Sequence, residues 1–430
     1  MSQKRKLLVI LISLISIITH QVFAVPAVPW AVEKQQPDGS IVQVYIKGDE
    51  KVHWMESMDG YTLMYDSQKY IVYAEKDADG NMIPSKIKYG HPLSASEKSG
   101  LQKGIGYSES QIQMLKQIWE VGNSTKGIMP VIGEKKALCV LMGFQDKPFV
   151  KTVEEFENLM NQEGYSASGA KGSVKDFYFE NSYGQLDLTV TVVGPYVTND
   201  NLLYYAPEYR WQTFAQEAIL AADEDVDLIE FANENDELET FHIIYAGYGD
   251  EAISNGRQIW AHKSQLASPV TLDGVKVSVY SCSPELRDGY GSNITNIGVI
   301  CHELCHVFGA PDYYDINGFM GGSYEGTGEW DLMASGNWNE NGVTPAHINM
   351  FQKILYGWVV PEELTAYAEI VDMPNSAENA VAYTIEANDN GELYVLENRQ
   401  RVGFDVSIPG HGLLIYHIHQ NAVNGYVNNT

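Results

Sequence analysis

The chain has 430 residues, of which 44% are apolar and 20% are charged, a composition that fits a globular protein and excludes long disorder or a fibrous repeat. Its formal net charge of -28 argues against nucleic acid and anionic lipid as partners. Four cysteines in so long a chain exclude a disulfide scaffold, and the length predicts two or three structural units.

The amino-terminal residues predict an export signal. A basic start at residues 4–6 precedes an apolar run at 7–18, and Val22 and Ala24 supply the small residues that a signal peptidase reads. The alternative is an uncleaved membrane anchor, which the short apolar run disfavours. We therefore expect residues 1–24 to be a signal peptide and the product to be secreted, extracellular and monomeric, with no membrane span.

Residues 38 to 90 predict a small antiparallel β unit. The segment 41–46 is strand-like, and turn residues at 58–61 and 79–81 separate further short strands. A helix is expected at 109–120 behind a cap at Ser108, followed by a linker at 122–133 that contains glycine and proline. This linker is the clearest domain boundary in the chain.

Beyond the linker the pattern alternates between strands and helices. The continuous apolar run at 137–142 is typical of a strand covered on both faces, and the alternation at 186–193 is also typical of a strand. The helices expected at 152–160 and 173–180 each begin at a hydroxyl residue that can serve as the cap. The pattern predicts strands at 137–142, 186–193 and 241–247, helices at 152–160, 173–180 and 211–222, and a β-rich end with strands at 382–386, 393–398 and 413–417. The chain stops soon after the last strand, which indicates fraying or truncation, and we favour truncation.

An acidic stretch at 223–239 carries nine carboxylates. A calcium site is one interpretation, because calcium prefers oxygen ligands. However, residues 233–238 lack the glycine that lets a calcium loop turn sharply, so we favour a solvated acidic loop.

One motif carries chemistry. His302 and His306 form an H-E-x-x-H pattern on an apolar, helix-like run at 294–308. A spacing of four places both imidazoles on one face of a helix, where they can bind one Zn²⁺. Glu303 then lies next to the first ligand, as expected for the general base that takes a proton from a zinc-activated water.

The residues after the motif suggest a third ligand. Gly309 can end the helix with a positive φ, and Pro311 prevents the helix from resuming. Asp312 then follows where the chain has turned back, and Asp315 is the alternative. Two nitrogens and one oxygen leave a fourth position for water, which is the open coordination of a catalytic zinc site.

These residues resemble the immune inhibitor A family of secreted bacterial metalloproteases. The resemblance rests on H-E-L-C-H-V-F-G-A-P-D at 302–312 and W-D-L-M-A-S-G at 330–336, and similar segments occur at 172–186, 246–262, 345–358 and 397–412. The family belongs with the metzincins, in which a methionine turn lies beneath the zinc, and Met333 matches that turn. Residues 38–90 are similar to the family's propeptide.

The resemblance implies an α+β fold with a metzincin-like zinc peptidase domain. We expect a propeptide at 25–128, the catalytic domain at 129–364 and a β-rich C-terminal segment at 365–430. The implied function is a zinc-dependent endopeptidase that acts on proteins or peptides and is made as a latent proenzyme. The acidic stretch lacks the calcium pattern of relatives, so a calcium cofactor is disfavoured.

Several other residues could bind zinc, maintain latency or contact the substrate. Cys301 and Cys305 flank the histidines but lie roughly 100° around the helix from them, so we expect packing thiols. No cysteine lies between residues 25 and 133, so latency would need a carboxylate such as Asp59 or steric cover. For the substrate we expect an antiparallel path along an exposed strand edge at 241–246. We expect structural roles for the remaining candidates, His242, His262, His347, Trp260, Trp330 and Trp338.

Two other functions could also use a zinc-binding motif of this kind. A non-catalytic surface-binding module with a structural zinc site would have no use for Glu303, which is not a ligand. A zinc hydrolase whose third ligand is a distant glutamate is disfavoured by Asp312 and Met333. The sequence therefore favours a zinc peptidase.

Overall fold

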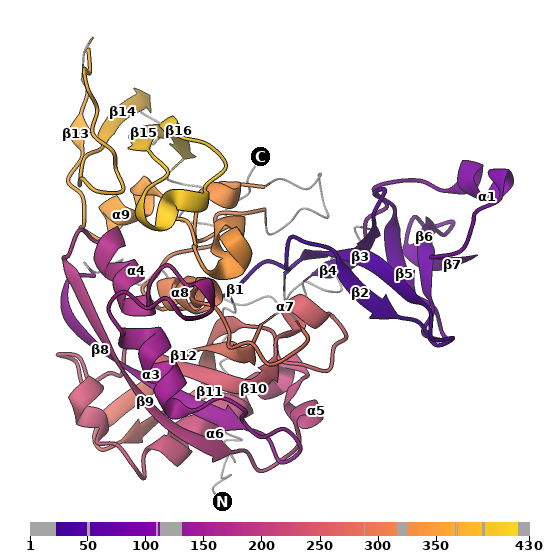
Figure 1. Cartoon of the computed structure of the whole chain (residues 1–430), viewed down its shortest axis with the longest axis horizontal. Coiled ribbons are helices and arrows are strands. Elements are labelled where there is room, and N and C mark those ends of the chain that lie inside the picture. Colours follow the sequence, from indigo (N-terminus) through magenta and orange to yellow (C-terminus); the bar gives the residue numbers. More distant parts are fainter. Residues whose placement is uncertain are drawn as a thin grey trace, which may run out of the picture.

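The computed structural model describes residues 23–49, 52–108, 111, 131–287, 289–315, 325–365, 367, 369–388 and 392–419. Within these residues the chain combines helices with three β-sheets, which follow one another along the sequence apart from one short strand (Figure 1). Most of the predicted signal peptide, the predicted helix at 109–120 apart from Gln111, and the linker at 122–130 lie outside the described residues.

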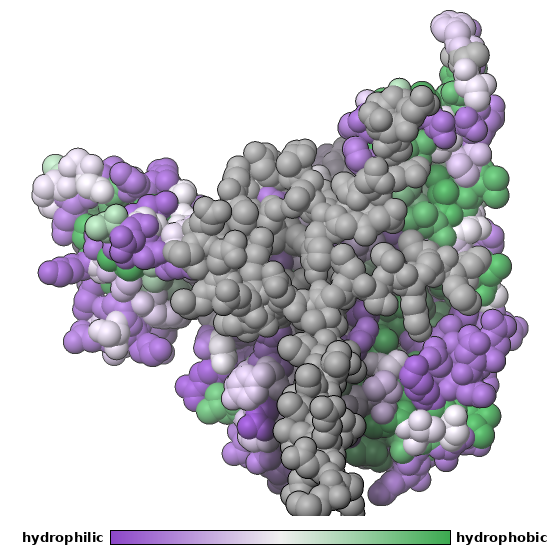
Figure 2. Space-filling model, turned by 180° about the vertical axis from the view of Figure 1, so that it is seen from behind, coloured by the Kyte–Doolittle hydropathy of each residue, from purple (hydrophilic) through white to green (hydrophobic). Residues whose placement is uncertain are grey.

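The first sheet is an antiparallel meander in which each strand pairs with the next one along the chain. Its buried core contains Val44, Met55, Leu63 and Ile71, and its described surface is mostly hydrophilic (Figure 2). This sheet confirms the β unit expected at 38–90. Its strands are β2 (Val32–Gln35), β3 (Ile41–Gly48), β4 (His53–Ser57), β5 (Thr62–Tyr65), β6 (Ile71–Lys76) and β7 (Met82–Lys88), followed by the helix α1 (Ala95–Gly100).

The second sheet is mixed and has the strand order β1-β11-β12-β10-β8-β9. Its inner pairs β12·β10, β10·β8 and β8·β9 are parallel, whereas β1 and β12 pair with β11 in the antiparallel direction. The strands are β1 (Phe23–Ala24), β8 (Gly133–Gly143), β9 (Leu186–Val197), β10 (Phe241–Tyr248), β11 (His262–Leu272) and β12 (Val275–Leu286).

Alternate residues of β8 explain why its apolar run is continuous. Cys139 and Leu141 belong to the core cluster on one face of the sheet, whereas Leu138 and Val140 belong to the cluster on the other face. The strand is therefore covered on both sides, as a run without polar residues predicts. The first face packs against α3 (Val153–Asn161), α4 (Val174–Asn181) and α8 (Ile297–Val307), and the second against α6 (Trp211–Ala222).

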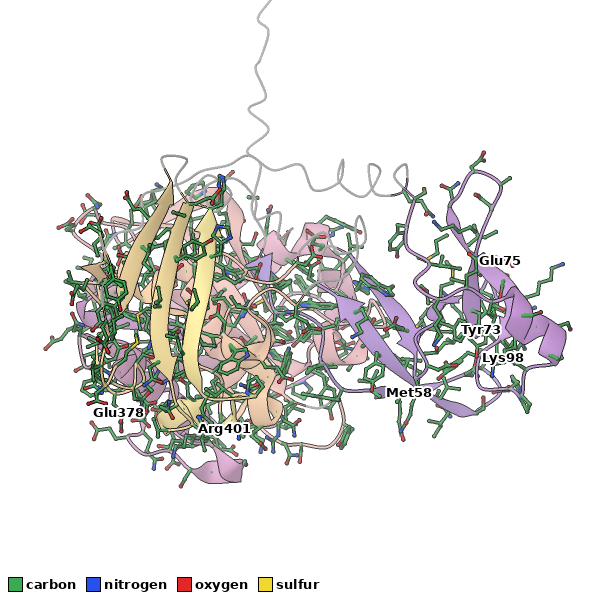
Figure 3. The ribbon with its side chains drawn as sticks, turned by 90° about the horizontal axis from the view of Figure 1, so that it is seen from above. Met58, Tyr73, Glu75, Lys98, Glu378 and Arg401 are labelled. Carbon is green, nitrogen blue, oxygen red and sulfur yellow. The ribbon has the colours of Figure 1, made fainter. Side chains whose placement is uncertain are left out.

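The third sheet has the order β13-β14-β15-β16 and lies at the opposite end of the molecule from the first (Figure 3). Its strands are β13 (Glu362–Glu363), β14 (Tyr383–Asn388), β15 (Glu392–Arg399) and β16 (Gly412–His419). Short helices lie between the strands: α5 (Leu202–Tyr205), α7 (Asp250–Ile253), α9 (Met350–Leu355) and the 3-10 turns η1 (Ala167–Gly169), η2 (Glu208–Arg210), η3 (Leu228–Phe231), η4 (Gly328–Trp330), η5 (Ser335–Gly342) and η6 (Gly403–Ser407).

One expectation about the sheet is wrong. The segment 241–246 was expected to present an exposed edge, but β10 lies inside the sheet between β12 and β8. Its residues Phe241 to Ala246 are all buried, because both faces and both edges of the strand are covered.

The domain boundaries expected from the sequence stay predictions. Within the described part of the chain, no helix is both long and apolar enough to cross a membrane.

Candidate metal centre and active site

The helix α8 carries both histidines of the H-E-x-x-H motif. Every residue from Ile297 to His306 is buried, and the helix packs closely on η5. A Cβ atom at Gly298 would lie only 2.0 Å from the carbonyl oxygen of Asn337, so a glycine is required for this approach. The apolar run of this segment therefore forms a central helix that is fixed against the rest of the core.

The end of α8 brings the third candidate ligand back to the histidines. Gly309 has a φ of 98°, which ends the helix as predicted. The amide of Ala310 donates to the carbonyl of Cys305, and Asp312 follows with 5% of its surface exposed. The tight turn thus places a carboxylate beside the last turn of the helix.

Three side-chain donor atoms meet at this point. The Nε2 atoms of His302 and His306 are 3.0 Å apart, and each lies 3.2 Å from Oδ1 of Asp312. Among the described residues, these are the three His, Cys, Asp or Glu side chains whose donor atoms gather closely enough to bind one metal ion. Asp315, the alternative from the sequence, is not part of this group.

Hydrogen bonds to the backbone fix the tautomers of both imidazoles. Nδ1 of His302 lies 2.8 Å from the carbonyl oxygen of Leu332, and Nδ1 of His306 lies 2.8 Å from that of Ala310. Because a carbonyl oxygen only accepts, each Nδ1 carries the hydrogen and each Nε2 presents a lone pair. Such a second contact is typical of histidines that bind metals.

The charges of the group favour a cation between the three atoms. Burial lowers the pKa of His306, and the neighbouring Asp312 offsets that effect only in part. Burial alone would raise the pKa of Asp312, but the two imidazoles outweigh it and hold that pKa well below its ordinary value. The ionised Asp312 carboxylate therefore faces the Nε2 atoms that the two Nδ1 contacts direct at it, an arrangement that a divalent cation stabilises.

Met333 lies in a loop that contacts both His302 and the residue that follows Asp312. Its carbonyl oxygen accepts from the amide of Tyr313, the residue after Asp312, at 2.8 Å. The carbonyl of the preceding Leu332 is the one that holds His302. Asp331 shapes the loop by accepting from the amides of Met333 and Asn349. The loop is thus built as a support for the ligands.

Glu303 is fully buried and is not part of the donor group. Its Oε1 atom accepts a hydrogen bond from the backbone amide of Val25, at 3.0 Å, although 278 residues separate the two in sequence. The start of the described chain therefore reaches the carboxylate that the sequence analysis identified as the candidate base.

The segment after residue 22 crosses the site in an extended form. The strand β1 pairs antiparallel with β11, with Ala24 opposite His262. The indole nitrogen of Trp260 then donates to the carbonyl of Val25 at 2.9 Å, and that of Trp338 donates to the carbonyl of Pro26 at 3.1 Å. The sheet edge beside the site is therefore β11, and the chain's own residues cover it.

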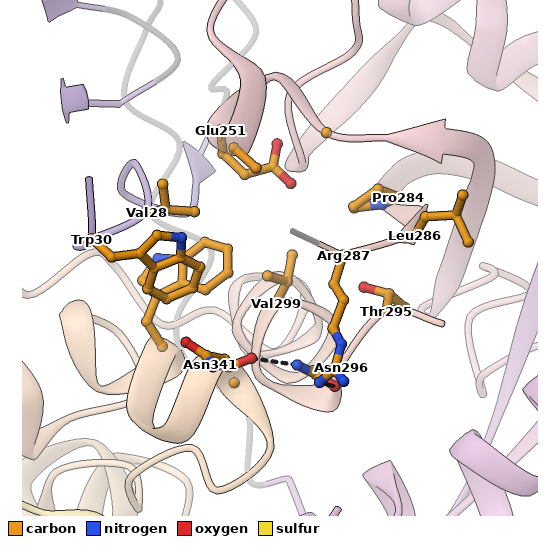
Figure 4. A pocket seen from close by; sticks show the side chains of 14 residues that line it. Val28, Trp30, Glu251, Pro284, Leu286, Arg287, Thr295, Asn296, Val299 and Asn341 are labelled. Carbon is orange, nitrogen blue, oxygen red and sulfur yellow. Dashed lines mark hydrogen bonds between the residues drawn. The ribbon is translucent and has the colours of Figure 1, made fainter. Parts of the chain in front are cut away.

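A small cavity lies farther along this segment (Figure 4). Val28 and Trp30 of the segment line one side, and Glu251, Arg287 and Val299 contribute to the remainder. The amide of Val28 donates to the carbonyl of Glu251 at 3.2 Å. Burial raises the pKa of the Glu251 carboxyl to about 8, so this carboxyl is mainly uncharged at neutral pH.

The model of one protein family matches the chain. The immune inhibitor A peptidase M6 catalytic domain aligns with residues 133–359, more than half of the sequence, and this range contains the buried His-His-Asp group. The chain belongs to the immune inhibitor A peptidase family. It is therefore a metallopeptidase that acts on protein substrates. A comparison with curated proteins found no match.

The other cysteines and histidines of this peptidase have structural surroundings. Cys301 and Cys305 are buried free thiols, and Sγ of Cys305 contacts the hydroxyl of Tyr356 at 3.2 Å. The three further histidines considered from the sequence also lie outside the donor group. His242 contacts Ser281, His262 contacts Tyr280 and stacks on Trp211, and His347 contacts Glu180.

The acidic stretch is held by lysines. Nζ of Lys276 lies 2.7 Å from Glu237, and Nζ of Lys135 lies 3.0 Å from Glu239. The side chain of Asn233 closes the turn by accepting from the amides of residues 235 and 237. These contacts fit the solvated loop expected from the sequence.

Asp59, the carboxylate considered for latency, lies in the exposed turn between β4 and β5. Its Oδ1 accepts from the hydroxyl of Ser57 at 2.8 Å, and it contributes nothing to the donor group. The structure instead brings Val25 to Glu303. Sequence analysis missed this contact and the two indole donors, because no local pattern reveals which distant strand edge a segment will cover.

Proposed function

We propose that this peptidase is a zinc-dependent endopeptidase with Glu303 as general base and acid, exported by its amino-terminal signal and made as a latent proenzyme. One observation carries the proposal: a buried carboxylate that is not a ligand adjoins a His-His-Asp group whose three donor atoms lie within 3.2 Å of one another. Such a pattern is expected of a catalytic metal site that keeps a position open for water.

The donor set fits zinc. Two imidazole nitrogens and one carboxylate oxygen suit this metal, and the Nδ1 contacts to Leu332 and Ala310 orient the rings. When bound, zinc supplies a Lewis acid that polarises the scissile carbonyl and activates water. The loop around Met333 would then be the methionine turn of a metzincin-like domain.

Glu303 would move the proton. It would accept a proton from the attacking water and return it to the nitrogen of the departing amine. The amide of Val25 supports this role, because its nitrogen lies 3.0 Å from Oε1 of Glu303, where the leaving nitrogen would need to be. Burial of Glu303 excludes bulk water from this transfer.

The substrate would lie along β11 in the antiparallel direction, as β1 does. Trp260 and Trp338 would then donate their indole N–H groups to the first two carbonyls after the scissile bond, as they do to Val25 and Pro26. Recognition of backbone carbonyls does not depend on side chains, so the cleft would accept varied sequences within proteins.

Latency would arise from occupancy of the same cleft. Residues 25–28 would stay in place after signal removal, and Val25 contacts Glu303. The carbonyls of Val25 and Pro26 also accept from the two indoles that would bind substrate. Side chains of the following region also cover both indoles: Trp30 packs edge-on against Trp338, and His53 packs on Trp260. If signal removal follows Ala24, the nitrogen at Glu303 becomes the α-amine of Val25. Substrate could then enter only after this segment leaves.

Casein hydrolysis by the protein beginning at Val25 tests the proposal. Activity should be low before, and at least about tenfold higher after, cleavage in the linker at 122–133 and removal of the released part. A chelator should abolish it and Zn²⁺ should restore it. Hydrolysis that survives complete metal removal would contradict a zinc peptidase, and equal activity before and after cleavage would contradict latency.

A further inference from the structure

The C-terminal sheet contacts the catalytic region through the turn η6. Oδ1 of Asp405, which is fully buried, accepts from the backbone amide of His347 at 2.9 Å. The hydroxyl of Thr344 contacts that of Ser407 at 3.0 Å. Two bonds from η6 therefore hold the segment 344–347, which has little regular structure of its own.

A second carboxylate strengthens this attachment. Oε1 of Glu180, in α4, accepts from the amide of Phe404 and lies 2.8 Å from Nε2 of His347. The backbone of η6 and the ring of His347 are thus joined to the same oxygen. The segment cannot shift without breaking contacts on both sides.

Arg399, at the end of β15, fixes the carboxylate of Asp405. Its Nε donates to Oδ2 at 2.7 Å, and its Nη2 donates to Oδ1, so the pair is bidentate. Both side chains are at most 1% exposed. A bidentate pair of this kind sets the direction of the carboxylate as well as its charge, and its geometry is retained because water has no access.

The segment 344–347 in turn holds the methionine turn on both sides of Met333. The amide of Ala346 donates to the carbonyl of Gly336 at 3.0 Å, and the amide of Leu332 donates to the carbonyl of His347 at 3.4 Å. The backbone of the turn therefore depends on the position of residues 346 and 347.

The turn finally contacts two of the three candidate ligands. The carbonyl of Leu332 orients the ring of His302, and the carbonyl of Met333 accepts from the amide that follows Asp312. Hydrogen bonds and short backbone stretches thus connect Arg399 to the metal group: first Asp405, then the backbone of His347, then that of Leu332, then the ring of His302.

We propose that Asp405 and Arg399 are positioning residues for the metal centre, although they lie outside the range 133–359 that matches the family's catalytic domain. They hold the methionine turn so that Leu332 keeps the Nε2 atom of His302 directed at the other two donors. This inference rests on the proposed function, because it concerns the metal that the proposed reaction uses. Contacts that orient ligands typically change metal affinity by about 10- to 100-fold.

The test is the rate at which the whole protein releases its metal to a chelator. Asp405→Ala should accelerate release by about 10- to 100-fold, Arg399→Met should act in the same direction, and Asp405→Asn, which keeps an acceptor for the His347 amide, should fall between Asp405→Ala and the unaltered protein. The visible spectrum of the Co²⁺-loaded protein should shift in Asp405→Ala, because the ligand field depends on the direction of His302.

Glu285→Ala is the matched control. Glu285 is also fully buried, and its carboxylate accepts from the backbone N–H groups of Val150, Lys151 and Gly247, which lie neither among the candidate ligands nor in the methionine turn. Release should be measured at the same interval below the Tm of each variant, so that a general loss of stability affects both variants equally. Glu285→Ala should release metal at the rate of the unaltered protein.

Release from Asp405→Ala that is no faster than from Glu285→Ala would overturn the inference. Metal stoichiometry of the unaltered protein separates this result from a failure of the proposed function, since release requires no peptidase activity. An unaltered protein that holds no Zn²⁺ or Co²⁺ would overturn both.

Discussion

His302, Glu303 and His306 occupy one turn and a half of α8, yet their surroundings differ. Backbone carbonyls accept from Nδ1 of each histidine, which directs both Nε2 atoms toward Asp312. Glu303 contacts a backbone amide instead. The fold thus separates the two candidate metal ligands from the candidate base, although the three are neighbours in sequence.

The third ligand can be tested by comparing two aspartates. Asp312→Ala removes a buried donor that lies 3.2 Å from both imidazole nitrogens, so the protein should lose most of its bound zinc. Asp315→Ala should keep one zinc per chain, because Asp315 is not in the donor group. Metal analysis after dialysis measures both, and zinc loss in Asp315→Ala alone would reverse the assignment.

Glu251 predicts a pH effect on stability. Its pKa is raised by burial from 4.5 to about 8 in the folded chain. Between these two values the folded state keeps a proton that the unfolded state has lost, so the free energy of unfolding falls as pH rises through this window. The fall is on the order of a few kcal/mol at pH 8.

Urea unfolding at pH 5 and pH 8 measures this effect. Glu251→Gln has no proton to lose, so it should be more stable than the unaltered protein by a larger margin at pH 8 than at pH 5. Titrating groups that do not interact with Glu251 are shared by both proteins and cancel in the comparison, whereas the neighbouring Asp250 does interact with it. An equal margin at both pH values would show that Glu251 does not titrate in this window.

The strand β11 and the two indoles beside it form the expected substrate path. Trp260→Phe keeps an aromatic ring at this position but loses the indole N–H that contacts the Val25 carbonyl. In the processed enzyme this change should raise KM about three- to tenfold with little change in kcat, the effect of one hydrogen bond. Trp338→Phe should do the same only for peptides with at least two residues after the scissile bond.

Trp358→Phe is the control for these variants. Its indole nitrogen donates to the carbonyl of Val131, not to the segment in the cleft. The variant should lose stability but keep its KM. Peptide kinetics that show the same KM in all three variants would contradict the proposed path along β11.

Local patterns predict the catalytic elements well. The helix α6 has the predicted bounds, and the helix at 294–308 and the strand at 137–142 appear as α8 and β8. The expectation that residues 241–246 form the substrate-binding edge was wrong for a physical reason. The apolar run of β10, which only His242 interrupts, is typical of an interior strand. Buried and partly exposed residues alternate from His262 to Leu266 in β11, as in a strand with an accessible face.

Such local patterns cannot predict contacts between residues that are far apart in the sequence. The H-E-x-x-H spacing predicts a metal site because its geometry is that of one helix turn. The bond from Val25 to Glu303 spans 278 residues, and the path from Arg399 to His302 takes four hydrogen-bonded steps. Only the assembled molecule brings these groups together.

Taken together, the molecule surrounds its metal group with parts from both ends of the chain. Residues 25–28 cover Glu303 and the two indoles, and the C-terminal sheet contacts the segment that holds the loop around Met333. The amino-terminal cover would have to leave before catalysis, whereas the C-terminal contacts are buried and would remain. These two ends therefore have opposite expected effects: removal of the first should raise activity, and disruption of the second should lower metal retention.

The most direct test of the account compares the processed protein with its Glu303→Gln variant in casein hydrolysis, with the metal content of both measured. The variant keeps the size of the side chain and all three candidate ligands, so it should hold one zinc per chain while kcat/KM falls by about 10²- to 10⁴-fold. A variant that holds its zinc and hydrolyses casein as fast as the unaltered enzyme would contradict the central claim that Glu303 transfers the proton in this metallopeptidase.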